Sequence, residues 1–306
     1  MKNILVTGGL GYIGSLTSKI LSEKGYKVTI VDNLMFKQNA EYILSKFNKV
    51  NFVNGDVRDE TLMKKLIKDN DIIIPLAGIV GAPLCDKMPK ETMEINTGAV
   101  KYLSSVCSKD QLILMPVSNS GYGIGEKDKF CDENSPLKPV SLYGRSKVEA
   151  EKIIMERENS ISFRLATVFG VSSFRMRSDL MVNNFIYLAT KKEVFKLFEP
   201  NFRRNFVHLS DVSAAFDYAI DNFLQMKGNI FNLGLNDANL TKIMLCEKIK
   251  EYIKDFKYEI IEDQKDPDQR DYFVSNEKLK NFGFEASFGL DKGILELVNY
   301  YKKNLS

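Results

Sequence analysis

The sequence of 306 residues predicts an α/β protein built on a doubly wound parallel sheet. Short β-branched runs alternate with helical patterns through the first half, and the run Asp71–Ala77 (DIIIPLA) is apolar after its first residue. Strands that alternate with helices form right-handed βαβ units. An uninterrupted apolar run is typical of a strand covered by helices on both faces. These observations, together with a glycine-rich turn after the first strand, predict the fold class.

In chain order, the expected strands are Asn3–Thr7, Lys27–Val31, Val50–Asn54, Asp71–Ala77, Gln111–Val117 and Ile161–Leu165. The expected helices are Tyr12–Lys24 (closed by Gly25), Ala40–Phe47, Thr92–Cys107 and Ser141–Arg157. After Gly170 the strand signals become shorter and arginines cluster, which indicates a smaller mixed lobe beside the strand ends. Two more strands are expected in this second half, at Asn205–Leu209 and Asn229–Leu233.

Composition excludes several classes of function. The net charge is +3 and no basic block stands out, so neither nucleic acid nor an anionic membrane is an expected partner. Four separated cysteines and the single His208 predict no metal site and no disulfide framework. The apolar run Ile4–Val6 is too short for a signal peptide, and no stretch approaches the ~18 apolar residues of a membrane span. We therefore expect a cytoplasmic protein with reduced thiols.

The turn after the first strand reads TGGLGYIG, with glycines at positions 8, 9, 11 and 14. Glycines at such a turn let the backbone approach a pyrophosphate, and the helix that follows offers unpaired N–H donors. A glycine pattern alone is weak evidence, but its place between a strand and a helix predicts a dinucleotide site. We expect a Rossmann domain over residues 1–170, to which 204–233 returns, and a substrate-binding lobe over 171–203 and 234–306.

Asp32 narrows the choice of dinucleotide. It ends the second strand, eighteen residues after Gly14, where a carboxylate can accept hydrogen bonds from a ribose diol. A carboxylate repels a 2′-phosphate, and no Lys or Arg immediately follows it, so the sequence favours NAD over NADP. The alternative is that Asp32 only caps the next turn. Asp56 and Val57, after the third strand, could flank the adenine, although Asp56 could equally be a turn residue.

Tyr143 and Lys147 form a Tyr-x-x-x-Lys pair on one face of the helix expected over Ser141–Arg157. A nearby ammonium and an oxidised nicotinamide would both favour the phenolate, which makes Tyr143 a general base for a carbinol proton. The pair alone is common on amphipathic helices, where the tyrosine is a core residue. Ser118, however, follows the strand Gln111–Val117 at the edge of the sheet where α/β enzymes bind ligands. Its hydroxyl could stabilise charge on the reacting oxygen.

The glycine turn, Asp32, the Ser118–Gly123 turn and the Tyr143/Lys147 pair, in this order and spacing, resemble the extended short-chain dehydrogenases. These are the NAD-dependent sugar-nucleotide epimerases, dehydratases and reductases, and the likeness covers nearly the whole chain. The resemblance implies an enzyme that uses NAD on a nucleotide sugar, with Ser118, Tyr143 and Lys147 as its catalytic triad. It also implies a homodimer, because family members commonly pair two of their helices into a four-helix interface.

Further segments carry the resemblance. Leu76-Ala77-Gly78 resembles the family's cofactor-contacting turn, Asn96 stands at the position of a helix asparagine that shapes the active site, and Arg204–His208 resembles the segment whose arginine holds the substrate diphosphate and whose histidine is structural. The implied cofactor-binding residues are Gly8, Gly11, Tyr12, Ile13, Gly14, Asp32, Asn33, Asp56, Val57, Leu76, Ala77, Gly78, Tyr143, Lys147 and Ala166. The implied substrate-binding residues are Ser118, Asn119, Ser120, Thr167, Arg175, Arg177, Asp179, Leu180, Arg204 and Arg270.

The arginines have a second interpretation. Two phosphates suit bidentate guanidinium donors, so Arg204, Arg270 and one of Arg175 and Arg177 are expected at the substrate. The alternative is that these side chains are solvated or paired with Asp268 and Asp271, and it applies to Arg175, Arg177, Arg203, Arg204 and Arg270.

The residues after Ser118 disfavour the multistep reactions of the family. Where its 4,6-dehydratases have Asp-Glu, this sequence has Asn119-Ser120, and neither side chain can protonate a leaving hydroxyl. The decarboxylating members have a glutamate at the Ser120 position, and the 3,5-epimerase/reductases have a cysteine there. The chemistry that remains is a hydride transfer at one carbinol, which we place at C4 of the sugar.

The loop Ile79–Cys85 and the turn SNSGYGIGEKD resemble a narrower subgroup, the enzymes that process GDP-linked heptoses for bacterial capsules, among them the GDP-manno-heptose 4-dehydrogenase. The expected reaction is therefore oxidation of a GDP-linked heptose to its 4-keto form in capsule biosynthesis. Two alternatives stay open. One is an NDP-sugar 4-epimerase, which reduces the keto-sugar from its other face, and the other is a non-catalytic NAD-binding regulator.

Overall fold

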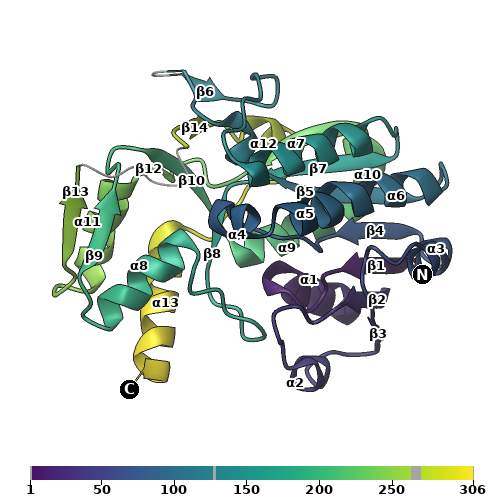
Figure 1. The fold of residues 1–306 in the computed structure, drawn as a ribbon, viewed down its shortest axis with the longest axis horizontal. Coiled ribbons are helices and arrows are strands. Elements are labelled where there is room, and N and C mark those ends of the chain that lie inside the picture. The colour runs from purple at the N-terminus through teal and green to yellow at the C-terminus, as the bar shows by residue number, and fades with distance from the viewer. Residues whose placement is uncertain (1, 127–128, 263–269, 306) are drawn as a thin grey trace.

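A seven-stranded parallel sheet forms the centre of the computed structural model, which describes residues 2–126, 129–262 and 270–305 (Figure 1). Its strand order is β11-β7-β5-β4-β1-β2-β3. The chain runs outward from β1 first in one direction and then in the other, so the order reverses between β1 and β4. The strands are β1 (Asn3–Thr7), β2 (Lys27–Asp32), β3 (Val50–Asn54), β4 (Ile72–Pro75), β5 (Leu112–Ser118), β7 (Ser160–Leu165) and β11 (Asn229–Leu233).

The inner strands send alternate side chains into two separate apolar cores. In β1, Ile4 and Val6 enter one core while Leu5 enters the other. In β4, Ile72 belongs to the first core and Ile73 to the second. Because side chains alternate along a strand, this arrangement requires apolar residues at every position. It is the physical reason for the continuous apolar run in the sequence.

Helices cover both faces of this sheet (Figure 1). On one face lie α1 (Tyr12–Glu23) and α9 (Leu209–Asp221), joined by a hydrogen bond of 3.0 Å between the hydroxyls of Thr17 and Ser213. On the other face lie α3 (Glu60–Lys68), α6 (Ala99–Val106) and α7 (Leu142–Met155), whose buried residues share the second core. The shorter helices are α2 (Ala40–Leu44), α4 (Ala82–Lys87), α5 (Pro89–Met93), α10 (Phe223–Met226) and α12 (Glu277–Asn281).

A smaller mixed lobe lies beside the central sheet (Figure 1). Its helices are α8 (Met181–Thr190), α11 (Lys242–Tyr252) and α13 (Leu290–Leu305), and its strands β9 (Phe195–Phe198) and β13 (Tyr258–Ile261) pair in parallel. Two small sheets complete the structure. One is β12-β10-β8, formed by β12 (Asn239–Thr241), β10 (Arg203–His208) and β8 (Thr167–Phe169), and the other pairs β14 (Phe273–Val274) with β6 (Phe130–Cys131).

The predicted fold class is confirmed, with a doubly wound parallel sheet and a smaller mixed part. The expected strand Asn229–Leu233 is the edge strand β11, whereas Asn205–Leu209 corresponds to β10, which joins the small three-stranded sheet instead. Among the helices that cover the central sheet, the sequence analysis did not predict α3 and α9. In α3 only three residues are buried, so its apolar stripe is narrow. Among the described residues, no helix is long and apolar enough to cross a membrane.

Candidate active site

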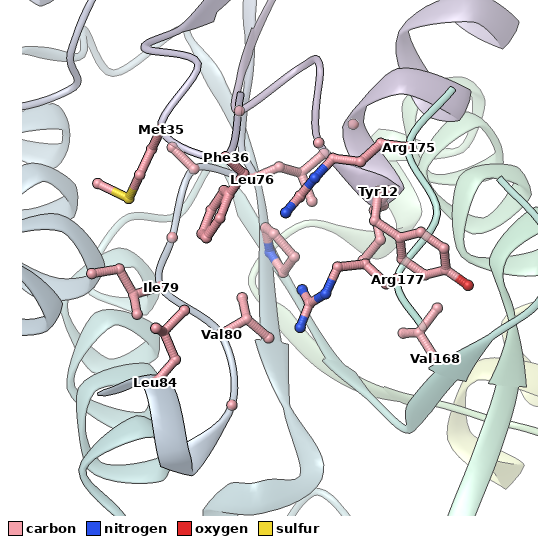
Figure 2. A pocket seen from close by; sticks show the side chains of 18 of the residues that line it. Tyr12, Met35, Phe36, Leu76, Ile79, Val80, Leu84, Val168, Arg175 and Arg177 are labelled. Carbon is pink, nitrogen blue, oxygen red and sulfur yellow. The ribbon is translucent and has the colours of Figure 1, made fainter. Parts of the chain in front are cut away.

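A cavity of about 740 Å³ opens at the carboxyl ends of the central strands, where the strand order reverses (Figure 2). Ligands of open α/β sheets bind at this place because the loops diverge there. Most of the residues singled out in the sequence line it: Gly8, Gly11, Tyr12, Ile13, Gly14, Asp32, Asn33, Val57, Leu76, Ala77, Gly78, Ser118, Tyr143, Lys147, Ala166, Thr167, Arg175, Arg177, Asp179, Leu180 and Arg270. Asp56, Asn119, Ser120 and Arg204 are not among its lining residues.

The glycine turn fits the backbone of a dinucleotide. Gly8 has φ +65°, and a Cβ there would lie 2.7 Å from the amide nitrogen of Ala77. A Cβ at Gly14 would lie 2.3 Å from the carbonyl oxygen of Gly8. Side chains at these positions would therefore force the turn apart. With hydrogen in their place, the N-terminus of α1 reaches the cavity and directs its first N–H groups toward a phosphate.

Asp32 holds two turns and lines the cavity, and its contact with a ribose diol stays a prediction. Its carboxylate accepts hydrogen bonds from the amides of Leu10 (3.1 Å) and Leu34 (2.9 Å), so it holds the glycine turn and the turn after β2. It also lines the cavity. The Gln38 side-chain amide donates to the same carboxylate (3.4 Å). A carboxylate has about four acceptor positions, so one position stays open toward a ribose hydroxyl.

The environment of Asp56 is that of a turn residue, the second of the two roles considered in the sequence. Its carboxylate binds the guanidinium of Arg58 (2.8 Å) and accepts a hydrogen bond from Asn33 (2.9 Å). These hydrogen bonds hold the pKa of Asp56 far below its usual value, and the bond from Arg58 has the largest effect. Its neighbour Val57 lines the cavity, whereas Asp56 serves the turn beneath it.

Ser118 and Tyr143 come from separate elements and meet inside the cavity. Ser118 ends β5, and its hydroxyl accepts a hydrogen bond from the amide of Ser120 (3.2 Å), which fixes its direction. Tyr143 lies in the first turn of α7, whose N-cap Ser141 accepts a hydrogen bond from the amide of Gly144 (3.1 Å). Both side chains line the cavity, and the nearby Ser118 hydroxyl acts to lower the pKa of Tyr143. The structure thus brings together two residues that are 25 positions apart in the sequence.

Burial dominates the electrostatics of the Tyr143/Lys147 pair. It raises the pKa of Tyr143 to about 12, against the lowering influence of the Ser118 hydroxyl and the charge of Arg270. It lowers the pKa of Lys147 to about 8. The expectation that the tyrosine pKa falls toward neutrality is therefore not met by the protein alone, because desolvation of the phenolate outweighs the nearby positive charges.

Asn96 fixes the floor of the site. It is buried in a π-helical turn, Glu94–Gly98, between α5 and α6, a local widening that often marks functional positions. Its side-chain amide exchanges hydrogen bonds with the backbone of Ile79 (2.8 and 2.9 Å) and donates to the Ser146 hydroxyl (3.1 Å). A Cβ at Gly78 would lie 3.1 Å from the side-chain oxygen Oδ1 of Asn96 and 3.4 Å from Lys147 Nζ. Gly78 therefore leaves the space into which the lysine reaches.

The predicted substrate residues separate into groups. Arg177 lines the cavity, and its guanidinium binds the carboxylate of Asp179 through two hydrogen bonds (2.6 and 2.5 Å). Arg270 lines the same cavity. Arg204 is only 1% exposed, donates to the carbonyl oxygen of Arg203 (2.9 Å) and lies outside the cavity lining. Its contact with a substrate diphosphate therefore stays a prediction. The side chains of Asn119 and Ser120 are buried next to Ser118, also outside the lining.

The suggested arginine–aspartate pairs are only partly present. Asp271 binds Arg203 (2.7 Å), and Asp268 lies outside the described residues. His208 is buried, with one ring nitrogen at 2.7 Å from the Ser210 hydroxyl and the other at 2.9 Å from Glu296, as a structural residue would be.

Several lining residues were not predicted. They are mainly apolar: Met35 and Phe36 of the loop after β2, Ile79 and Val80 of the loop after β4, and Leu84 of α4. Figure 2 shows them on the side of the cavity opposite Tyr12 and Val168. Apolar loop residues give no periodic signal, although Phe36, four residues after Asp32, is an aromatic residue in the turn beside the predicted dinucleotide site.

Comparison with known proteins agrees with this geometry. Residues 4–234 match the model of the NAD-dependent epimerase/dehydratase family. The chain belongs to this family. A putative UDP-glucose 4-epimerase of Methanocaldococcus jannaschii is 30% identical over 98% of this chain and 99% of its own. The human dTDP-D-glucose 4,6-dehydratase is 24% identical over 99% of this chain and 91% of its own.

A solved structure shares the fold. The UDP-glucose 4-epimerase of Thermotoga maritima, determined with UDP-glucose, covers 99% of this chain and 100% of its own, with a TM-score of 0.83 and 24% identity. The protein is therefore an NAD-dependent enzyme of the epimerase/dehydratase family, and the expectation of NAD as cofactor is confirmed.

Proposed function

We propose that the protein oxidises C4 of a nucleotide sugar, with a GDP-linked heptose as substrate and its 4-keto form as product, in the synthesis of a bacterial capsule polysaccharide. Bound NAD⁺ supplies the acceptor for the hydride that leaves the carbinol carbon. The proton of the same hydroxyl goes to Tyr143. The presence of Ser118 and Tyr143 in one cavity carries this proposal, because a hydroxyl donor and a proton acceptor can then act on one reacting oxygen.

Each member of the proposed triad has a distinct role. Tyr143 takes the proton as the phenolate, a form that burial disfavours in the protein alone. Lys147, buried on the same helix face, and the positive ring of the oxidised cofactor are the charges that favour this form. Ser118 donates a hydrogen bond to the substrate oxygen while the amide of Ser120 fixes its direction.

The carboxylates of the site argue against elimination of water. Among the described lining residues, only Asp32 and Asp179 have a carboxylate side chain. Asp32 holds the glycine turn, and Asp179 is bound to Arg177. A dehydratase needs an acid and a base that act on a second carbon of the sugar, and the two residues that follow Ser118 are an amide and a hydroxyl. Simple hydride transfer is the chemistry that these groups support.

The choice of sugar rests on the loop after β4. Its resemblance to the enzymes of GDP-linked heptoses covers Ile79–Cys85, and Ile79, Val80, Gly81 and Leu84 of this loop line the cavity. We also propose that the protein acts in the cytoplasm as a homodimer, as the family resemblance implies. Light scattering on the purified protein tests the dimer.

A panel of nucleotide sugars tests the proposed reaction. We expect NAD⁺-dependent formation of a 4-keto product from a GDP-linked heptose, followed by NMR. Tyr143→Phe should lower turnover by at least about 10²-fold, as is usual when a general base is lost, and leave NAD binding nearly intact. Tyr42→Phe, at an exposed tyrosine, is the matched control. Turnover of UDP-galactose with none of a GDP-linked heptose would overturn the substrate assignment, and an active Tyr143→Phe would remove this residue from the mechanism.

The second candidate is an NDP-sugar 4-epimerase, which the 30% identical archaeal relative favours by its name. The two reactions share the oxidation at C4 and differ in the fate of the keto-sugar. Epimerisation leaves no net NADH, because the hydride returns to the other face of the sugar. Accumulation of NADH therefore supports the dehydrogenase, and a C4-inverted product without NADH supports the epimerase.

A further inference from the structure

Arg175 lies in the segment between β8 and α8. Its side chain reaches the end of the cavity that is lined by the glycine turn. Its guanidinium carbon lies 4.4 Å from the centre of the Phe36 ring, and Figure 2 shows the side chain extending toward this ring. A Cβ at Gly11 would lie 3.9 Å from Arg175 Nη1. The cation therefore stands beside the glycine turn, where the sequence predicts the pyrophosphate of the cofactor, although the sequence interpretation assigned it to the substrate.

Both partners of this contact are held by side-chain-capped turns. The Ser172 hydroxyl accepts hydrogen bonds from the amides of Phe174 (3.4 Å) and Arg175 (3.2 Å). On the other side, the carboxylate of Asp32 holds the amide of Leu34, and the Asn33 side chain holds the amide of Met35 (3.0 Å), directly before Phe36. The two loops that meet across the mouth of the cavity are thus locally fixed.

The two arginines of this loop differ in their partners. Arg177 is bound to Asp179 through two hydrogen bonds. Within the described part of the chain, Arg175 makes no ion pair, and its guanidinium contacts the Phe36 ring instead. Burial first, and then the charge of Arg177, lower the pKa of Arg175, while the charges of Asp179 and Asp32 raise it by less. A diphosphate at this place would add an anion in direct contact with the guanidinium.

We propose that Arg175, held against Phe36, binds the pyrophosphate of the dinucleotide and closes the smaller lobe over it. The N–H groups of α1 contact the phosphates from below, and a guanidinium adds the opposite charge with two parallel donors. The inference concerns the cofactor half of the site and does not depend on which sugar the enzyme uses. The diphosphate of a nucleotide sugar has the same chemistry, so the test must separate the two sources.

Calorimetric titration of nucleotide-free protein makes this separation. ADP-ribose carries the pyrophosphate of NAD, adenosine carries none, and GDP represents the diphosphate of the substrate. We expect Arg175→Gln to weaken ADP-ribose binding about 10- to 100-fold, the usual value of a charge-assisted contact, and to leave adenosine and GDP unchanged. Phe36→Ala should produce a smaller loss of the same kind, because the arginine keeps its charge but loses its support.

Two controls complete the experiment. Arg145→Gln removes an exposed arginine of α7 outside the cavity lining, and it should bind ADP-ribose like the wild type. Raising the salt concentration should weaken ADP-ribose binding more in the wild type than in Arg175→Gln, because the variant has lost a screened charge.

An unchanged affinity of Arg175→Gln for ADP-ribose would overturn the proposal. So would an equal loss for adenosine, which would indicate a structural role, or a loss confined to GDP, which would place the arginine at the substrate.

Discussion

Replacing Lys147 by methionine should make the cofactor-free protein more stable at neutral pH. The lysine is 6% exposed, and its burial lowers its pKa from the usual 10.5 to about 8. At about 1.4 kcal/mol per pKa unit, this difference corresponds to roughly 3 kcal/mol by which the charged lysine destabilises the folded state. Methionine has a similar length and removes the charge, so the free energy of unfolding at pH 7 should rise by an amount of this order.

The direction of the pKa shift determines how the stability difference between the two proteins changes with pH. A lysine whose pKa is lower in the folded than in the unfolded state binds a proton less readily when folded, so its cost is fully present below about pH 8. The cost fades as the pH rises toward 10.5, because the unfolded chain then also loses the proton. The difference between Lys147→Met and the wild type should therefore shrink from roughly 3 kcal/mol at pH 7 to roughly 1 kcal/mol at pH 9.5.

Urea unfolding at these two pH values measures the difference. Lys152→Met on the same helix is the control, because this side chain is exposed and its methionine variant should show no comparable change. A Lys147→Met protein that is less stable than the wild type at pH 7, or equally more stable at both pH values, would refute the reasoning from desolvation. Such a result would mean that packing or hydrogen bonds of the ammonium outweigh its burial.

Two further predictions concern the core and the glycine turn. Glu151 and Arg164 form an ion pair (2.6 Å) in which both side chains are 5% exposed, so Glu151→Leu leaves a buried charge and should cost about 3–5 kcal/mol in urea unfolding. The double variant with Arg164→Met should recover much of this loss, and an additive loss would contradict the explanation. Gly14→Ala places a Cβ 2.3 Å from a backbone oxygen and should weaken NAD binding more than about tenfold, or about 1.4 kcal/mol, in a fluorescence titration. Gly289→Ala, with no atom within 4 Å of the added Cβ, is its control, and equal affinities of the two variants would show that the turn tolerates a side chain.

The local features of this protein follow from its sequence. The strands are recognisable because each inner position must be apolar on both faces, as in Ile72–Pro75. The glycine turn and Asp32 are local as well, since one strand, one turn and one helix suffice to build them. The i, i+4 spacing of Tyr143 and Lys147 places both on one face of a single helix. Such features depend on neighbours in the chain, so a sequence pattern can predict them.

Other features depend on contacts between distant segments. The contact of Phe36 with Arg175 joins residues 139 positions apart, and nothing in either loop signals the other. Arg204 carries the pattern of a phosphate ligand, yet the place of its strand in a separate small sheet puts it outside the cavity lining. The pKa of Tyr143 also follows from tertiary structure, because desolvation depends on what covers the phenol and not on the spacing to Lys147.

The sequence by itself thus determined the sheet, the cofactor turn and the candidate residues of the reaction. Only the tertiary structure decided which arginine stands at which end of the cavity and how burial sets the protonation of the pair. The physical reason is that backbone pattern and helix spacing are short-range, whereas burial and charge interactions act through space.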